Sequence, residues 1–216
     1  GPDNVGLQDL ADRTAYLNEQ DFLSLQAHVE AASGGTATIR RDAAGHIDYF
    51  YVLEKFKPSD IDSDLGDYSS HSSPAWQTRE YHPAFYVNGV LKDRILVSIF
   101  SCDIRTVDSN DYLVQSINSD PLPDEYTITE LREAAEKKGS GYHLMNFLEH
   151  SAVAIKSLDV TAALKGNDGE GKTLGTSVNE SLRGRVHNPV IGATYAGSGP
   201  LEWNHNQQPW GIADII

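Results

Sequence analysis

Apolar positions near the start of the chain recur every three or four residues, a spacing that predicts helix. The first run is heptad-like and consists of Leu7, Leu10, Thr14 and Leu17. A second run with the same spacing follows Asp21, whose side chain suits an N-cap, and Ser33-Gly34-Gly35 ends it. We therefore predict two short helices within residues 3–35. Two heptads are too few for a stable isolated coiled coil, so we expect this segment to act as a connector and oligomerisation element.

The pattern becomes strand-like from Thr36. Two β-rich runs flank the turn from Asp42 to Gly45, and the second, residues 47–54, is apolar on both faces, as in a central strand. The Asn88-Gly89 pair predicts another hairpin. Its expected apolar positions are Phe85 and Val87 before the turn and Ile95, Val97 and Ile99 after it.

Two capping boxes predict helices in the second half of the chain. Thr127 with Glu130 starts one helix near 128–138, and Asn146 with Glu149 starts another near 147–158. The positions expected to face the core are Ile128, Leu131, Ala135, Leu148 and Ile155. Together with the hairpins, these helices indicate an α+β fold.

Composition excludes several classes of partner. The 216 residues carry a net charge of −14, which opposes binding to nucleic acid phosphates and to acidic membranes. No apolar run approaches the roughly 20 residues of a membrane span, so we expect no membrane insertion. The single cysteine, Cys102, excludes an internal disulfide, and its apolar surroundings predict a buried strand thiol. Residues 1–2, Gly-Pro, resemble the scar of a removed tag and are set aside.

Motifs for catalysis or metal binding are weak. Alternating aspartates at 60, 62, 64 and 67 offer oxygen ligands for Ca²⁺, but the glycine and glutamate of a calcium loop are out of register. The run G-N-D-G-E-G-K-T within 165–175 matches a phosphate loop literally but follows a helix-like segment, so we interpret it as a surface loop. His82 precedes proline at a strand entry, which favours a structural role. We therefore expect no enzyme activity, no catalytic or metal site and no cofactor.

Three blocks of sequence carry a resemblance to a known family. They are G-Y-H-L-M-N-F-L-E at 141–149, H-P-A-F at 82–85, and the segment from G-S-G-P to W-G-I-A-D-I-I at 197–216. These resemble phage and prophage tail-fibre-type proteins with a C-type-lectin-like fold. Formylglycine-generating enzymes and the variable proteins of diversity-generating retroelements share that fold. The resemblance implies a C-type-lectin-like domain over residues 36–216, with a twisted antiparallel sheet and two helices. The family pattern continues beyond Ile216, which implies that the last strands are missing. By this resemblance, either a second, cleaved chain carries the C-terminal remainder or a strand of a partner replaces it.

The same resemblance implies a non-catalytic tail fibre or receptor-binding protein. Such a protein would be made in the bacterial cytoplasm, assemble as a homotrimer in the virion tail, and bind a glycan or protein receptor on the host surface. The expected ligand-binding residues are Trp203, Asn204, His205, Asn206 and Trp210, because exposed aromatic rings with neighbouring amides suit such ligands. One alternative is a structural tail or assembly adaptor. The other is an oxidase of the formylglycine-generating type, which needs two closely placed cysteines where this chain has only Cys102.

Overall fold

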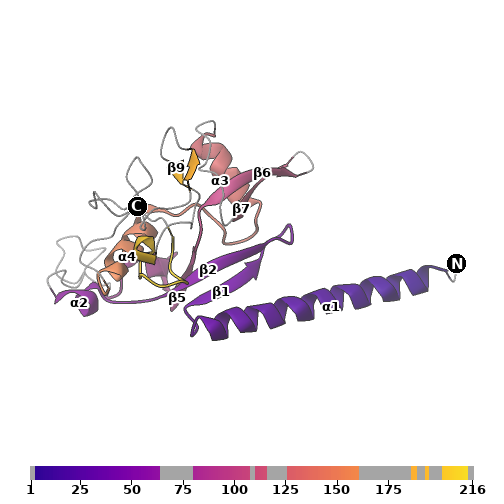
Figure 1. The fold of residues 1–216 in the computed structure, drawn as a ribbon, viewed down its shortest axis with the longest axis horizontal. Helices are drawn as coiled ribbons and strands as arrows, with labels where there is room; N and C mark the ends of the chain where they lie inside the picture. The colour runs from indigo at the N-terminus through magenta and orange to yellow at the C-terminus, as the bar shows by residue number, and fades with distance from the viewer. Residues whose placement is uncertain are drawn as a thin grey trace.

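A computed structural model describes residues 3–63, 80–107, 110–115, 126–160, 186–188, 193–194 and 201–213. Its helices and small antiparallel sheets establish a mixed α+β architecture, as the sequence predicts (Figure 1). In chain order the elements are α1 (Asp3–Ala32), β1 (Ala37–Arg41), β2 (Ile47–Glu54), α2 (Pro58–Ile61), β3 (Tyr86–Val87), β4 (Val90–Leu91), β5 (Arg94–Ser98), β6 (Cys102–Val107), β7 (Asn110–Gln115), α3 (Ile128–Glu136), α4 (Phe147–Ser157), β8 (Val186–Asn188) and β9 (Ala193–Thr194).

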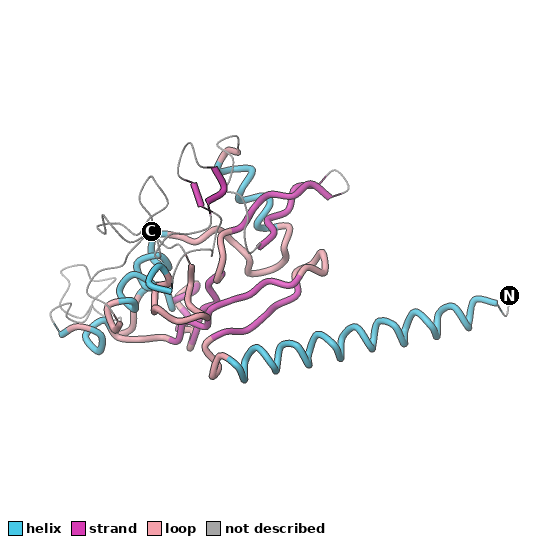
Figure 2. The backbone as a smooth tube through the Cα atoms, viewed as in Figure 1, coloured by secondary structure: helices cyan, strands magenta, loops and turns pink. Residues whose placement is uncertain are grey.

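The N-terminal segment is one continuous helix, so the prediction of two short helices is wrong. Asp21 lies inside α1 rather than at a cap, because an aspartate costs a helix interior less than about 1 kcal/mol and no glycine or proline interrupts residues 7–32. Phe22 and Val29 fix the second half of α1 by packing on the main core. Gly34 and Gly35, at φ 63° and 84°, end the helix where the sequence predicts. The first half of α1 projects away from the sheet (Figures 1 and 2).

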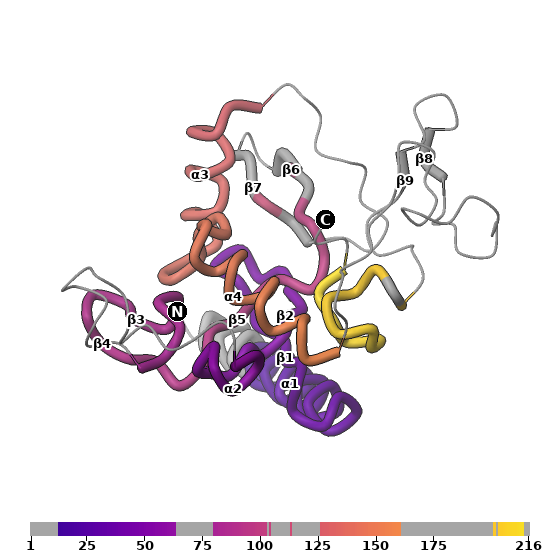
Figure 3. Tube along the Cα trace, turned by 90° about the vertical axis from the view of Figure 1, so that its left-hand side faces the viewer, coloured from indigo at the N-terminus to yellow at the C-terminus, as the bar shows by residue number. Residues whose placement is uncertain are grey.

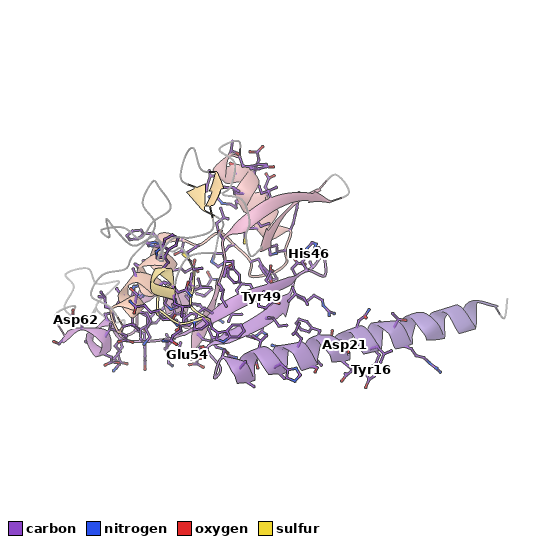
Figure 4. All side chains as sticks on the ribbon, in the orientation of Figure 1. Tyr16, Asp21, His46, Tyr49, Glu54 and Asp62 are labelled. Carbon is purple, nitrogen blue, oxygen red and sulfur yellow. The ribbon has the colours of Figure 1, made fainter. Side chains whose placement is uncertain are left out.

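The main sheet is antiparallel and has the order β1-β2-β5, so β2 is the central strand, as predicted. The β1–β2 turn is built by the carboxylate of Asp42, which accepts hydrogen bonds from the backbone N–H of Ala44 at 2.9 Å and of His46 at 2.8 Å. Figure 4 shows His46 at this turn and Tyr49 further along β2. The buried side chains of the main core include Ile39, Leu53, Phe85, Val97 and Val153.

The Asn88-Gly89 turn forms as predicted, but its strands differ from the prediction. Asn88 and Gly89 have φ values of 51° and 80°, the geometry that lets a two-residue loop join β3 to β4. The strand that carries Ile95 and Val97 is β5, and it pairs with β2 rather than with the arm before the turn. Local turn chemistry therefore set the hairpin, whereas burial against β2 set the partner of β5.

Helices α3 and α4 begin at the two predicted capping boxes, and both boxes form completely. The predicted inward faces are only partly correct. Ile128 is 62% exposed, and Leu131, Leu148 and Ile155 are partly buried. The fully covered positions are smaller residues, and they include the predicted inward position Ala135: Ala134, Ala135, Ala152, Val153 and Ser157.

A second, smaller core lies between α3 and the β6–β7 ribbon. It consists of Ile104, Leu113, Ala134 and Ala135, with Cys102 packed at its edge. Cys102 is in a strand, as predicted, but is only partly buried. In Figure 3, α3 lies above α4, and α4 overlies the main sheet in this view.

Three sequence predictions lie outside the described residues. They concern Asp64 and Asp67 of the aspartate-rich segment, the glycine-rich run 165–175, and the end of the chain at 214–216.

Candidate functional site

The loop at 201–213 contains all five residues that the sequence singles out, and the main core holds it in place. The backbone N–H of His205 donates to the carbonyl of Ile212 at 3.0 Å, and the N–H of Ile212 donates to His205 Nδ1 at 2.8 Å. The N–H of Ala213 donates to the carbonyl of Ile99 at 2.8 Å, next to the end of β5. Trp203 is 2% exposed and anchors the start of the loop.

The imidazole of His205 is fully buried and neutral. Burial and, to a smaller extent, the charge of Lys156 lower its pKa to about 4. Its ring packs edge-on against Tyr51, with the ring centroids 4.3 Å apart. Because Nδ1 accepts a hydrogen bond from the backbone, the proton of the neutral ring is on Nε2. The histidine is therefore a fixed spacer between the loop and β2.

The tip of the loop is a tight turn lined with amides. Asn204 Nδ2 donates to the carbonyl of Gln208 at 2.7 Å, and Asn206 Oδ1 accepts from the N–H of Gln208 at 3.0 Å. Gln207 has a φ of 55°, in the left-handed region. A Cβ at Gly211 would lie 2.0 Å from Asn206 Oδ1, so any larger residue there would have to displace the Asn206 side chain. The turn is locked, and its amides keep a fixed spacing.

Burial divides the predicted site residues into two groups. Trp203 and His205 lie in the core, so the expectation that they are exposed contacts is wrong. Buried and partly exposed side chains alternate along residues 203–206, and the two buried rings attach the loop to the core. Asn204, Asn206 and Trp210 are partly exposed, although Asn206 also hydrogen-bonds Tyr51 and Trp210 packs against the main core. Sequence reasoning missed Gln207, Gln208 and Gly211. The signal that could have found the two glutamines is the amide run N-H-N-Q-Q between the two tryptophans.

His82 has the structural role that the sequence favours. It is 1% exposed, and its Nδ1 accepts a hydrogen bond at 3.2 Å from the N–H of Ala84 at the start of a short 3-10 helix, Pro83–Phe85. Burial lowers its pKa to about 4. Its Nε2 lies 3.2 Å from Ser151 Oγ, but that hydroxyl donates to the carbonyl of Leu148 at 2.8 Å. The pair is therefore not arranged as a base and a nucleophile.

A groove of about 460 Å³ lies between α1 and the β1–β2 hairpin. Asn18, Asp21, Phe22 and Leu25 line it from α1, and Arg41, Gly45 and Ile47 line it from the hairpin. The guanidinium of Arg41 lies 4.6 Å above the Phe22 ring and 3.4 Å from the carboxylate of Glu19. On the same helix, Tyr16 and Leu17 are 63% and 60% exposed (Figure 4 labels Tyr16 and Asp21).

Neither a metal centre nor a membrane-spanning helix occurs in the part of the chain that the structure describes. No three His, Cys, Asp or Glu side chains gather there in a way that would hold a metal ion. No helix in those ranges is both long and apolar enough to cross a membrane. Searches with protein-family models and against curated proteins find no match to this sequence.

Proposed function

We propose that this chain is a non-catalytic receptor-binding protein of a phage or prophage tail, with a C-type-lectin-like domain that contacts the host surface through the loop at 204–210. One observation carries the proposal: a core of Trp203 and His205 fixes a loop whose outer side is rich in amides. A loop held rigid in this way loses little entropy on binding, which is the property that a recognition surface needs.

The chemistry of the loop fits hydroxyl-rich or peptide ligands. The side chains of Gln207 and Gln208 donate and accept hydrogen bonds, and the part of the Trp210 ring that does not pack against the main core offers a small apolar surface. The ligand is therefore a glycan or a protein segment of the host surface. The net charge of −14 disfavours acidic polymers as ligands.

The proposed particle is a homotrimer held together by α1. Two large apolar side chains on this helix, Tyr16 and Leu17, are more than half exposed, and Leu17 belongs to the heptad-like run. Packing against identical helices would cover Leu17. Light scattering of the intact chain tests this, with Leu17→Asp expected to give monomers that keep their helix content. A wild-type monomer with an intact α1 contradicts the trimer.

A binding screen of the intact protein against host surface extracts tests the receptor function. The extracts are divided into glycan and protein fractions, and Trp210→Ala and Gln208→Ala are compared with Gln20→Ala, an exposed glutamine on α1. We expect one fraction to bind wild type and Gln20→Ala, with binding at least tenfold weaker for both loop variants. Equal binding by all four proteins would contradict the role of the loop.

An assembly adaptor is the second candidate function, because one exposed apolar pair lies away from the loop. Phe147 is 82% exposed and Met145 is 42% exposed, on either side of the Asn146 cap. Exposed large apolar side chains on a rigid turn are typical of protein–protein contacts. Phe147→Ala would then reduce incorporation into the tail particle without changing binding to host extracts, whereas the loop variants would do the opposite.

A further inference from the structure

Lys138 lies between two buried carboxylates at the junction of the two cores. Its Nζ is 2.9 Å from Asp42 Oδ2, 3.1 Å from Asp48 Oδ1 and 2.9 Å from Asp48 Oδ2. The side chain of Lys138 is 5% exposed, and those of Asp42 and Asp48 are 0% and 2% exposed. Nζ is therefore almost equally far from both oxygens of Asp48 and in direct contact with its carboxyl group.

The surroundings hold this geometry firmly. Nζ also donates to the carbonyl of Leu113 at 2.6 Å, and the carbonyl of Lys138 accepts from the N–H of Ala43 at 2.8 Å. The Tyr142 ring covers the ammonium, with its centroid 5.5 Å away. The ion-pair distances of 2.9–3.1 Å therefore keep the amine and the two carboxyl groups in contact in a buried site, and such enforced proximity lowers the barrier to a reaction between them.

The three charges do not balance, because one ammonium faces two carboxylates. Burial raises the pKa of Asp48, with the charge of Asp42 adding to the effect, although Lys138 opposes it. Burial acts against the charge of Asp42 as well, but hydrogen bonds from Lys138 and His46 and the charge of Lys138 hold the pKa of Asp42 below its ordinary value. The two carboxylates likewise raise the pKa of Lys138 despite burial. Asp48 is thus the member that accepts a proton most readily, and Asp42 remains a carboxylate.

We propose that Lys138 and Asp48 condense to an intramolecular isopeptide bond, with Asp42 as the proton carrier. A proton first passes from the Lys138 ammonium to Asp48, which gives an amine and a carboxylic acid. The Nζ lone pair then attacks Asp48 Cγ, and the N–C bond forms. Asp42 takes a second proton from Nζ and delivers it to the departing hydroxyl, the C–O bond breaks, and one water leaves. Asp42 ends as the carboxylate it was at the start.

The bond would join β2 to Lys138, the second residue after α3, and so would link the two cores covalently. Lys138 and Asp48 are 90 residues apart in sequence. A cross-link over so long a loop stabilises chiefly by restricting the unfolded chain. Because the ammonium is the resting form, the reaction is slow and takes place after folding.

Mass spectrometry of the full-length protein tests the proposal. The intact mass is measured in denaturant, freshly purified and after several days at 37 °C, and a peptide map then locates any cross-link. We expect a species one water lighter than the sequence mass and a branched peptide that joins residues 48 and 138. An unchanged mass after incubation overturns the proposal. So does a lost water that the map places elsewhere, such as a succinimide at Asp168-Gly169.

Matched variants distinguish a covalent Lys138–Asp48 bond from a simple ion pair. Lys138→Arg keeps the charge and should show no loss of water. Asp48→Asn should lose ammonia instead of water and reach the same final mass as the cross-linked wild type. Asp42→Asn removes the proton carrier and should slow the reaction at least tenfold. If Lys138→Arg does not fold, the wild-type peptide map still decides.

Discussion

Acid should unfold this protein through its two buried histidines. His82 and His205 are 1% and 0% exposed, and each has its pKa lowered from 6.5 to about 4, chiefly by burial. Below pH 6.5 the unfolded chain binds a proton at each site while the folded chain does not. The stability that the neutral rings contribute is therefore present above pH 6.5 and is lost as the pH falls toward 4. Each histidine then costs about 3 kcal/mol over that window.

Two such losses are a large part of the 5–15 kcal/mol that typically separates folded and unfolded states. Two other groups act in the opposite direction over this pH range. The pKa of Asp48 is raised in the folded state, and the carboxylate of Glu149 raises the pKa of exposed His143. Both shifts favour the folded state as the pH falls. A comparison of wild type with His205→Asn cancels these contributions, because the groups are common to both proteins.

Asparagine at 205 places an acceptor oxygen where Nδ1 receives the N–H of Ile212 and removes the titrating ring. The assay is urea unfolding at several values between pH 7 and pH 4.5. We expect the variant to be less stable than wild type at pH 7, and the difference to shift in favour of the variant by about 2–3 kcal/mol at pH 4.5. Parallel stability curves for the two proteins would refute the reasoning.

Three further changes test the architecture. Gly211→Ala should distort the loop by forcing a Cβ against Asn206 Oδ1, with a loss of about 1–3 kcal/mol in urea unfolding; an unchanged midpoint would contradict the tight contact. Asp42→Ala should destabilise more than Asp48→Ala, since only Asp42 also accepts the two backbone hydrogen bonds of the β1–β2 turn, and thermal melts that rank them in the reverse order would be evidence against this. Asn146→Ala should cost about 1 kcal/mol by removing the cap of α4, measured by chemical denaturation against the exposed Gln20→Ala as control.

The sequence by itself determined the features that rest on interactions between residues close together in the chain. Both capping boxes and the Asn88-Gly89 turn formed where the sequence places them, because their hydrogen bonds and φ angles involve residues only a few positions apart. The end of α1 at Gly34-Gly35 and the α+β class follow for the same reason.

The tertiary structure decided what depends on contacts between distant residues. Asp21 looked like a cap, but packing of Phe22 and Val29 on the sheet made α1 continuous. Strand β5 pairs with β2 rather than with the segment that precedes the Asn88-Gly89 turn. Within one short loop, Trp203 and His205 went into the core while Asn204 and Asn206 stayed at the surface, because only the neighbouring β2 and β5 determine which side of the loop is covered. Lys138 contacts Asp42 and Asp48, which are about 90 residues away in sequence. No local sequence pattern predicts this contact, since it forms only when the two cores pack together.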